Sequence, residues 1–280
     1  MTVRIIAKLD IKNQSVIKGI NYEGFRVIGD PKVISKHYYE SGIDEIIYLD
    51  FISTYFNKSI DYKTIKSSTL NTFIPITVGG GVSSLSNTKD ILVKCGADKV
   101  ALNSALFKDI NLLNRLAKNI GSSNITCVVE VINYENKYFL TSSSGREIQK
   151  HNIFDWIKKI QDYGAGEILF VDVTREGLGN GFDLKIIEKI RKITKIPLVV
   201  NGGAGNFNQV LKLLKSINLE GVAISSLFHY NSTYLYKYNK KKQIGNFSYL
   251  NSLTKKKIEC DKSIISNLKK YLKKNKINVR

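Results

Sequence analysis

Two stretches of the 280-residue chain have the composition of an anion-binding strand end. Ile74 to Gly81 reads IPITVGGG, and Ile196 to Gly205 reads IPLVVNGGAG. Each begins with Ile-Pro, continues as a short apolar run typical of a buried strand, and then reaches glycines. Glycines at a strand end allow backbone N–H groups to close around an anion such as phosphate. The chain is therefore predicted to bind anions at two strand ends.

These two stretches belong to a longer internal repeat. From residue 74 to residue 196 is an offset of 122, and the same offset relates Gly42–Asp50 (GIDEIIYLD) to Gly164–Asp172 (GAGEILFVD). It also relates Val100–Ser104 (VALNS) to Val222–Ser226 (VAISS). A repeat of half the chain is too long for a solenoid unit and suits a closed architecture of two halves.

Eight short apolar runs alternate with segments of helical spacing. The runs are Arg4–Asp10, Glu45–Asp50, Pro75–Gly79, Lys99–Asn103, Thr126–Ile132, Glu167–Asp172, Pro197–Asn201 and Gly221–Ser225. Alternating strands and helices pair in parallel, so eight such units predict an α/β protein with a (β/α)8 TIM barrel. An open, doubly wound sheet is the alternative, and the two-fold repeat favours closure. We expect one domain over residues 1–280.

Polar residues cluster where these runs end. They are Asp10, Asp50, Thr77, Asn103, Glu130, Asp172, Asn201 and Ser225. Barrel enzymes place their chemistry at the carboxyl ends of the strands, so a shared functional rim is favoured over eight separate structural roles. Two loops are candidate covers of this rim: residues 11–31, which contain Lys18, and residues 174–183 (TREGLGNGFD).

Residues 231–261 interrupt the repeat with two lysine triplets and four tyrosines. We predict an insertion in the last strand–helix loop, suited to nucleic acid or an acidic partner, or simply solvated. After it, Ile264, Ile265, Leu268 and Leu272 have the spacing of a closing helix.

The formal charge of +19 reflects 43 Lys+Arg against 24 Asp+Glu. Such an excess fits either a nucleic-acid surface or lysines spread over solvated helix faces. No nucleic-acid motif accompanies the charge, so we expect no nucleic-acid partner, and a positive field would also suit a phosphorylated substrate.

The three cysteines, Cys95, Cys127 and Cys260, lack CxxC spacing and have few histidines near them. We expect reduced thiols in a cytoplasmic protein and no metal site. No apolar run is long enough to span a bilayer and no signal peptide follows Met1, so no membrane partner is expected.

Several longer motifs are together highly specific. They are RIIAKLD, VIKGINYEGFRVIGDP, GIDEIIYLD, ITVGGG, GADKVALN, GAGEILF, NGGAG and the ending YLKKNKINVR. Apart from the insertion, the chain resembles the cyclase subunit of imidazole glycerol phosphate synthase, the (β/α)8 barrel of histidine biosynthesis. The sister isomerase of that pathway shares the half-barrel repeat but resembles these motifs less.

The resemblance implies a lyase that uses ammonia from a separate glutaminase subunit, bound as a heterodimer, and needs no cofactor. Ammonia would attack a bis-phosphorylated ribulosyl aminoimidazole carboxamide, which splits into imidazole glycerol phosphate and an aminoimidazole carboxamide ribotide. Asp10 and Glu130 stand at the positions of the general acid and base. The implied phosphate-binding residues are Gly80, Gly81, Asn103 and Ser104 in one half, and Gly202, Gly203, Ser225 and Ser226 in the other. Arg4, Glu45, Lys99 and Glu167 stand at the positions of a charged ammonia gate, and Lys18 lies in the substrate loop.

The chain departs from the family pattern at three places. Glu130 replaces an Asp, Asn201 replaces a Ser, and Arg175 to Leu178 replaces Arg-Asp-Gly-Thr. An extra methylene moves a carboxylate by about 1 Å, which can cost on the order of 100-fold in rate. The alternative reading is therefore a paralogue that supplies ammonia for amidation (acetamidino formation) of a surface-polysaccharide sugar. A third reading is a non-catalytic barrel that only docks and activates a glutaminase, against which Asp10 and the paired phosphate sites argue.

Overall fold

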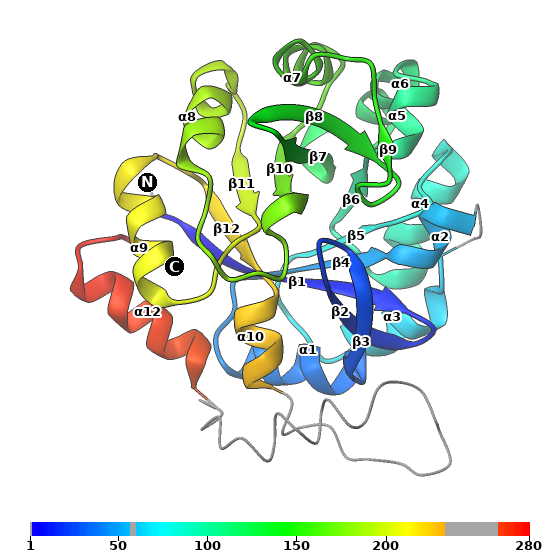
Figure 1. The fold of residues 1–280 in the computed structure, drawn as a ribbon. Helices are drawn as coiled ribbons and strands as arrows, with labels where there is room; N and C mark the ends of the chain where they lie inside the picture. Colours follow the sequence, from blue (N-terminus) through cyan, green and yellow to red (C-terminus); the bar gives the residue numbers. More distant parts are fainter. Residues whose placement is uncertain (1, 57–59, 233–262) are drawn as a thin grey trace.

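The computed structural model describes residues 2–56, 60–232 and 263–280. Within these residues, eight parallel strands pair side by side in a closed ring (Figure 1). They are β1 (Arg4–Lys12), β4 (Glu45–Asp50), β5 (Ile76–Gly79), β6 (Lys99–Leu102), β7 (Ile125–Tyr134), β10 (Glu167–Asp172), β11 (Leu198–Asn201) and β12 (Gly221–Ile224). The ring closes where Ile5 of β1 pairs with Val222 of β12. The predicted (β/α)8 barrel is confirmed, and every strand overlaps its predicted run.

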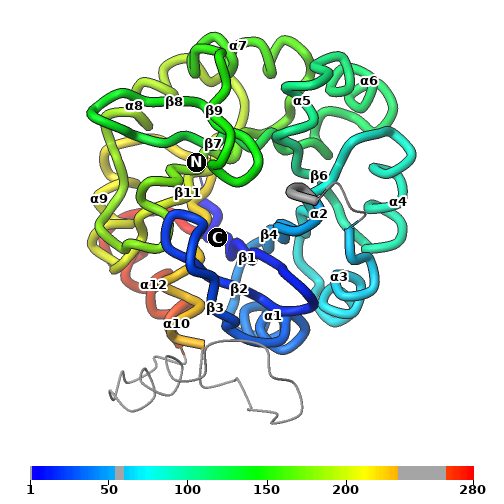
Figure 2. Tube along the Cα trace, turned by 45° about the vertical axis from the view of Figure 1, so that its right-hand side comes forward, coloured from blue at the N-terminus to red at the C-terminus, as the bar shows by residue number. Residues whose placement is uncertain are grey.

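Helices surround the ring, as Figure 2 shows. They are α1 (Pro31–Glu40), α2 (Phe51–Phe56), α3 (Tyr62–Thr69), α4 (Leu85–Cys95), α5 (Ser104–Lys108), α6 (Asn111–Ile120), α7 (Ile153–Asp162), α8 (Leu184–Ile193), α9 (Phe207–Ser216), α10 (Ser226–Asn231) and α12 (Ile264–Lys274). The predicted closing helix is α12, which buries all four predicted apolar residues. No helix in the described ranges is both long and apolar enough to cross a membrane.

Each strand contributes to two separate cores because successive side chains point to opposite faces. On β1, Ile5 and Leu9 pack against the helices, whereas Ile6 packs in the barrel interior. Interior neighbours of Ile6 include Ile47, Leu169 and Val199. The middle of the barrel is therefore a packed apolar layer, and polar side chains on the same interior face lie above or below it.

The long loop predicted at residues 11–31 is in fact a β-hairpin. β2 (Ser15–Ile20) pairs antiparallel with β1, and β3 (Glu23–Gly29) pairs with β2. The second half has the same feature after β7: β8 (Lys137–Ser142) pairs with β7, and β9 (Glu147–Ile148) pairs with β8. The prediction missed these strands because three of the four connections are two-residue turns without the glycine that usually indicates a positive φ, at residues 13–14, 21–22 and 135–136.

The hairpin turns extend the sequence repeat. Positive φ angles occur at residues 13, 14, 21 and 22, and again at residues 135, 136, 143 and 144. Each turn of the second half therefore follows its counterpart by the same 122 residues. The two halves share a backbone plan that includes the hairpins above the barrel.

Two sequence predictions fall partly outside the described ranges. The insertion predicted at residues 231–261 lies outside them from residue 233 onward. Cys95 and Cys127 are buried free thiols, whereas Cys260 also lies outside the described residues.

The buried face of α12 gives a stability prediction. Leu268 is fully buried against the barrel, so Leu268→Ala should lower the free energy of unfolding by about 2–5 kcal/mol through lost contacts and a residual cavity. Urea unfolding measures this change. Lys270→Ala on the exposed face of the same helix is the matched control and should change stability by less than about 0.5 kcal/mol. Equal effects of the two substitutions would mean that α12 does not close the barrel.

Candidate active site

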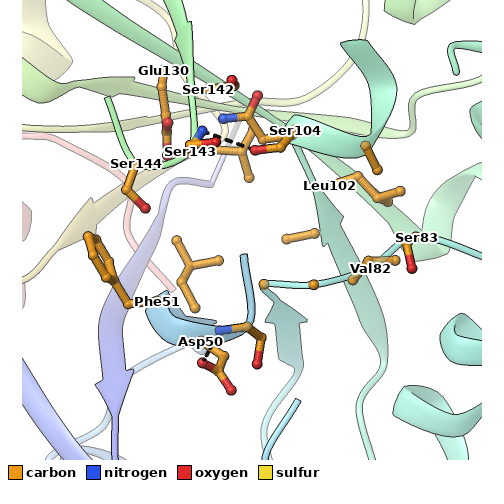
Figure 3. A pocket seen from close by; sticks show the side chains of 18 of the residues that line it. Asp50, Phe51, Val82, Ser83, Leu102, Ser104, Glu130, Ser142, Ser143 and Ser144 are labelled. Carbon is orange, nitrogen blue, oxygen red and sulfur yellow. Dashed lines mark hydrogen bonds between the residues drawn. The ribbon is translucent and has the colours of Figure 1, made fainter. Parts of the chain in front are cut away.

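A cavity of about 750 Å³ opens at the carboxyl ends of β1, β4, β5, β6 and β7. Its lining includes both predicted carboxylates, Asp10 and Glu130. It also includes all four predicted phosphate-binding residues of this half: Gly80, Gly81, Asn103 and Ser104. Figure 3 shows Glu130 and the 142–144 turn on one side of the space and Asp50 and Phe51 on the other. The two predicted carboxylates and the predicted phosphate-binding residues of the first half therefore share one cavity.

Glycine is required where β5 enters this cavity. Gly80 has a φ of 98°, and a Cβ atom there would collide with the backbone carbonyl of Asp50. The close approach lets the chain turn directly at the strand end. Across the cavity, the Ser143 N–H donates to Ser104 Oγ at 3.0 Å, so the hairpin of the second half contacts the predicted anion cradle of the first half, which consists of Gly80, Gly81, Asn103 and Ser104.

Against the neighbouring barrel strand, Glu130 of β7 has the register that Asp10 has in β1, although the two residues are 120 positions apart rather than 122. Asp10 pairs with Leu49 and Glu130 with Val171, and residues 49 and 171 are again 122 apart. The Gly145 N–H donates to Glu130 Oε2 at 3.1 Å. Burial raises the pKa of Glu130 to about 7, although this hydrogen bond opposes the rise. A carboxyl group that titrates near neutral pH is suited to both accept and donate a proton.

Asp10 is held by a lysine that the sequence analysis did not single out. Lys8 Nζ donates to the two carboxylate oxygens of Asp10 at 2.8 and 2.9 Å. Both side chains are buried, at 0% and 2% exposed. Burial by itself lowers the pKa of Lys8, but the neighbouring carboxylate outweighs it and raises the pKa well above its usual value. Lys8 therefore remains an ammonium ion that fixes Asp10 in place.

The same lysine connects to a second ion pair. Lys8 Nζ lies 3.4 Å from Glu176 Oε1, and Lys18 of β2 pairs with that oxygen as well. Burial would raise the pKa of Glu176, but Lys18 and Lys8 lower it to about 2. Two lysines and two carboxylates thus form a charge-balanced cluster in the interior. The predicted substrate-loop residue, Lys18, is a member of it and is 1% exposed.

Tyr22 is another cavity residue that the sequence analysis missed. It occupies the second turn of the first hairpin with a φ of 62°, and its ring lies 5.0 Å from Lys8 Nζ. Nothing in the sequence marks this position. Lys8 was detectable, since it alternates with Ile6 and Asp10 along an interior-facing strand.

The predicted phosphate-binding residues of the second half also lie together, but in a far smaller space. Gly202, Gly203, Ser225 and Ser226 line a cavity of about 10 Å³. Glu176, Gly177 and Gly179 of the loop after β10 also line it. Ser225 Oγ donates to the Lys8 carbonyl at 2.9 Å, and Asn201 Nδ2 donates to the Ala223 carbonyl at 2.9 Å. The two predicted phosphate sites thus share a sequence pattern but differ in the volume of the space beside them.

Four charged residues meet at the opposite mouth of the barrel. Arg4 donates to Glu45 at 2.6 Å and to Glu167 at 2.5 Å. Lys99 donates to the same two carboxylates at 3.1 and 3.2 Å. The predicted gate residues therefore form a closed ring of alternating charge. They come from β1, β4, β6 and β10, which are spread around the barrel, so the ion pairs span its mouth.

Thr77 corrects one of the rim predictions. Its hydroxyl donates to Glu45 Oε1 at 3.0 Å, so it belongs to the ring at the amino-terminal mouth. The reason is that β5 continues beyond Thr77 to Gly79, and only the glycines reach the carboxyl rim.

Asp50 and Asp172 do follow their strands, but their side chains fasten the local backbone. Asp50 Oδ1 accepts from the N–H groups of Ile52 and Ser53, and Asp172 Oδ1 accepts from Arg175 N–H. Burial raises the pKa of Asp172 to about 6.

Among the described residues, no group of three His, Cys, Asp or Glu side chains is arranged to hold a metal ion.

The raised pKa of Glu130 gives a pH prediction. Between its usual pKa of 4.5 and pH 7, Glu130 keeps its proton in the folded state and loses it in the unfolded state. The free energy of unfolding therefore falls as the pH rises towards 7. Glu130→Gln removes the titration. The variant should therefore gain about 3 kcal/mol relative to the wild type between pH 4 and pH 8. Urea unfolding across this range tests it, and a stability difference that is independent of pH would contradict the assignment.

Comparison with known proteins agrees with this architecture. The family model described as "Histidine biosynthesis protein" matches residues 4–234. Imidazole glycerol phosphate synthase subunit HisF of Legionella pneumophila is 36% identical over 208 residues, which cover 74% of this chain and 98% of that protein. The Bacillus cereus (strain G9842) subunit of the same name is 32% identical over 244 residues, covering 87% and 96%. That of Lactococcus lactis is 36% identical over 235 residues, covering 82% and 89%. The chain therefore belongs to the histidine biosynthesis protein family.

Proposed function

We propose that this protein is the ammonia-dependent cyclase of imidazole glycerol phosphate synthase. The observation that carries the proposal is the single cavity that contains Asp10, Glu130 and the first anion cradle. The relatives named HisF support the same assignment. The substrate would be the bis-phosphorylated ribulosyl aminoimidazole carboxamide. The products would be imidazole glycerol phosphate and an aminoimidazole carboxamide ribotide.

In this proposal the two carboxylates divide the proton transfers. Glu130 exchanges protons with the reacting atoms, because its pKa of about 7 lets both protonation states exist at neutral pH. Asp10, fixed by Lys8, accepts the proton that ammonia loses as it adds to a carbonyl carbon, and its negative charge stabilises the positive charge that develops there. Backbone N–H groups near Gly81 hold one phosphate and orient the chain of the substrate.

We further propose that a glutaminase subunit docks at the amino-terminal mouth. An exposed apolar patch lies at that end: Phe73 and Val93 are each 81% exposed, and Leu70 is 62% exposed. They line a groove of about 530 Å³ together with Asp98, the residue before Lys99 of the charged ring. Exposed apolar side chains beside charged side chains that are held in ion pairs are typical of a protein–protein interface. Ammonia released there would enter beside the ring.

The decisive experiment supplies the purified protein with ammonium salt and the proposed substrate. The wild type should form imidazole glycerol phosphate, and Asp10→Asn should lose roughly 100- to 10,000-fold in turnover, since the mutant lacks the charge and the proton acceptor. Circular dichroism and thermal unfolding establish that the variant is folded. Unchanged turnover in Asp10→Asn would remove this residue from the mechanism. A folded wild type without turnover would reject the cyclase and leave amidation of a surface-polysaccharide sugar as the activity to assay.

The ring at the mouth gives a separate prediction. Lys99→Ala removes one cation between Glu45 and Glu167 and should uncouple glutamine hydrolysis by the glutaminase from product formation. Turnover with free ammonium should remain within about twofold of the wild type, because the cavity lies at the other end of the barrel. Parallel assays with glutamine and with ammonium measure the two routes. If both fall equally, the ring has only a structural role.

A further inference from the structure

The side chain of Tyr22 reaches the cavity from the first hairpin, on a backbone conformation that a bulky residue rarely adopts. Tyr22 occupies the turn between β2 and β3 with a φ of 62°, where glycine, asparagine or aspartate is the usual residue. The turn is held in place because the Asn21 N–H donates to the Glu176 carbonyl at 2.8 Å. Strained backbone of this kind is common at active sites and ligand sites. The hairpin therefore holds Tyr22 at the cavity at a conformational cost.

The ring of Tyr22 is fixed by its neighbours, whereas its hydroxyl is not bonded. The ring meets Phe51 edge-on, with centroids 5.8 Å apart, and lies 5.0 Å from Lys8 Nζ. The residue is only 3% exposed. Within the described residues, the hydroxyl oxygen has no hydrogen-bond partner. A buried polar group without a partner costs free energy, and a ligand that supplies an acceptor would recover it.

This hydroxyl lies among the groups of the proposed chemistry. Tyr22 lines the same cavity as Asp10 and Glu130. It is also close enough to the buried ion cluster for the charges of Lys8 and Glu176 to act on it. Burial raises the pKa of Tyr22 well above its usual value, and Lys8 opposes this rise only in part. The phenol therefore keeps its proton at neutral pH and is available as a hydrogen-bond donor.

We propose that Tyr22 is a further catalytic residue, whose hydroxyl donates a hydrogen bond to the substrate oxygen that becomes negative when ammonia adds. In that step a C–N bond forms, and the π-electron pair of the carbonyl group moves onto its oxygen. Asp10 takes the proton that the nitrogen loses, and Tyr22 stabilises the oxygen. A fixed donor that is aimed at developing charge needs no reorganisation during the reaction. This inference rests on the proposed cyclase function, because the acceptor is the carbonyl oxygen of that substrate.

The test is Tyr22→Phe in the full-length protein, which removes one hydroxyl and keeps the ring. With ammonium salt and the proposed substrate, kcat should fall about 100-fold while KM changes by less than about threefold, since the hydrogen bond strengthens only as charge develops. The midpoint of thermal unfolding should not fall, because no hydrogen bond within the described residues is lost.

Tyr38→Phe is the matched control. Tyr38 lies on α1, is fully buried outside the cavity, and has its hydroxyl 2.8 Å from His229 Nδ1. Removing this bonded hydroxyl should lower the midpoint of thermal unfolding by about 2 °C or more. It should leave kcat within about twofold of the wild type.

A fall in the unfolding midpoint of Tyr22→Phe as large as that of Tyr38→Phe would mean that the hydroxyl is bonded within the protein. This result would overturn the inference without any measurement of turnover. An unchanged kcat in Tyr22→Phe, or a change confined to KM, would overturn it as well. Absence of turnover in the folded wild type is a different result, since it rejects the cyclase and, with it, the acceptor named here.

Discussion

The balance of four buried charges constrains the rest of this site. Lys8, Lys18, Asp10 and Glu176 are each at most 2% exposed, and each cation contacts a carboxylate. Removing one partner from such a buried cluster costs about 3–5 kcal/mol because a charge is left uncompensated. The cluster therefore requires β1, its hairpin and the loop after β10 to be in place together. It joins the two half-barrels at the level where the proposed chemistry occurs.

The two duplicated halves share one backbone plan, but their corresponding side chains lie in different surroundings. Asp10 and Glu130 occupy matching register positions, yet Asp10 contacts a lysine at hydrogen-bond distance and Glu130 accepts from a backbone N–H. One site usually obtains carboxyl groups with different pKa values by placing them in different surroundings. The two predicted phosphate sites also differ, since one lies in a cavity of about 750 Å³ and the other beside a space of about 10 Å³.

Strand order, closure and the gathering of Asp10, Glu130 and the first cradle were predictable, because they follow from period-two burial and a repeat of fixed length. The hairpins were not, since turns such as Asn13–Gln14 adopt positive φ without glycine. Thr77 was placed at the wrong mouth because position along a short strand, which sequence patterns define poorly, decides which end a side chain reaches. The partners of Lys18 could not be predicted from the sequence either, because its contact with Glu176 spans 158 positions and depends on how two loops pack.

Closure of the ring also determines the order in which the strands can pair during folding. β1 needs β12 as its neighbour, and a hydrogen bond between the two regions joins Ser225 to Lys8 across 217 positions. Val3 bridges to Val279, almost at the other terminus. During synthesis, β1 therefore emerges long before β12, and its edge at residues 4–7 stays unpaired until residues 221–224 have been made. Such late, distant pairing slows folding and exposes an open strand edge to other chains in the meantime.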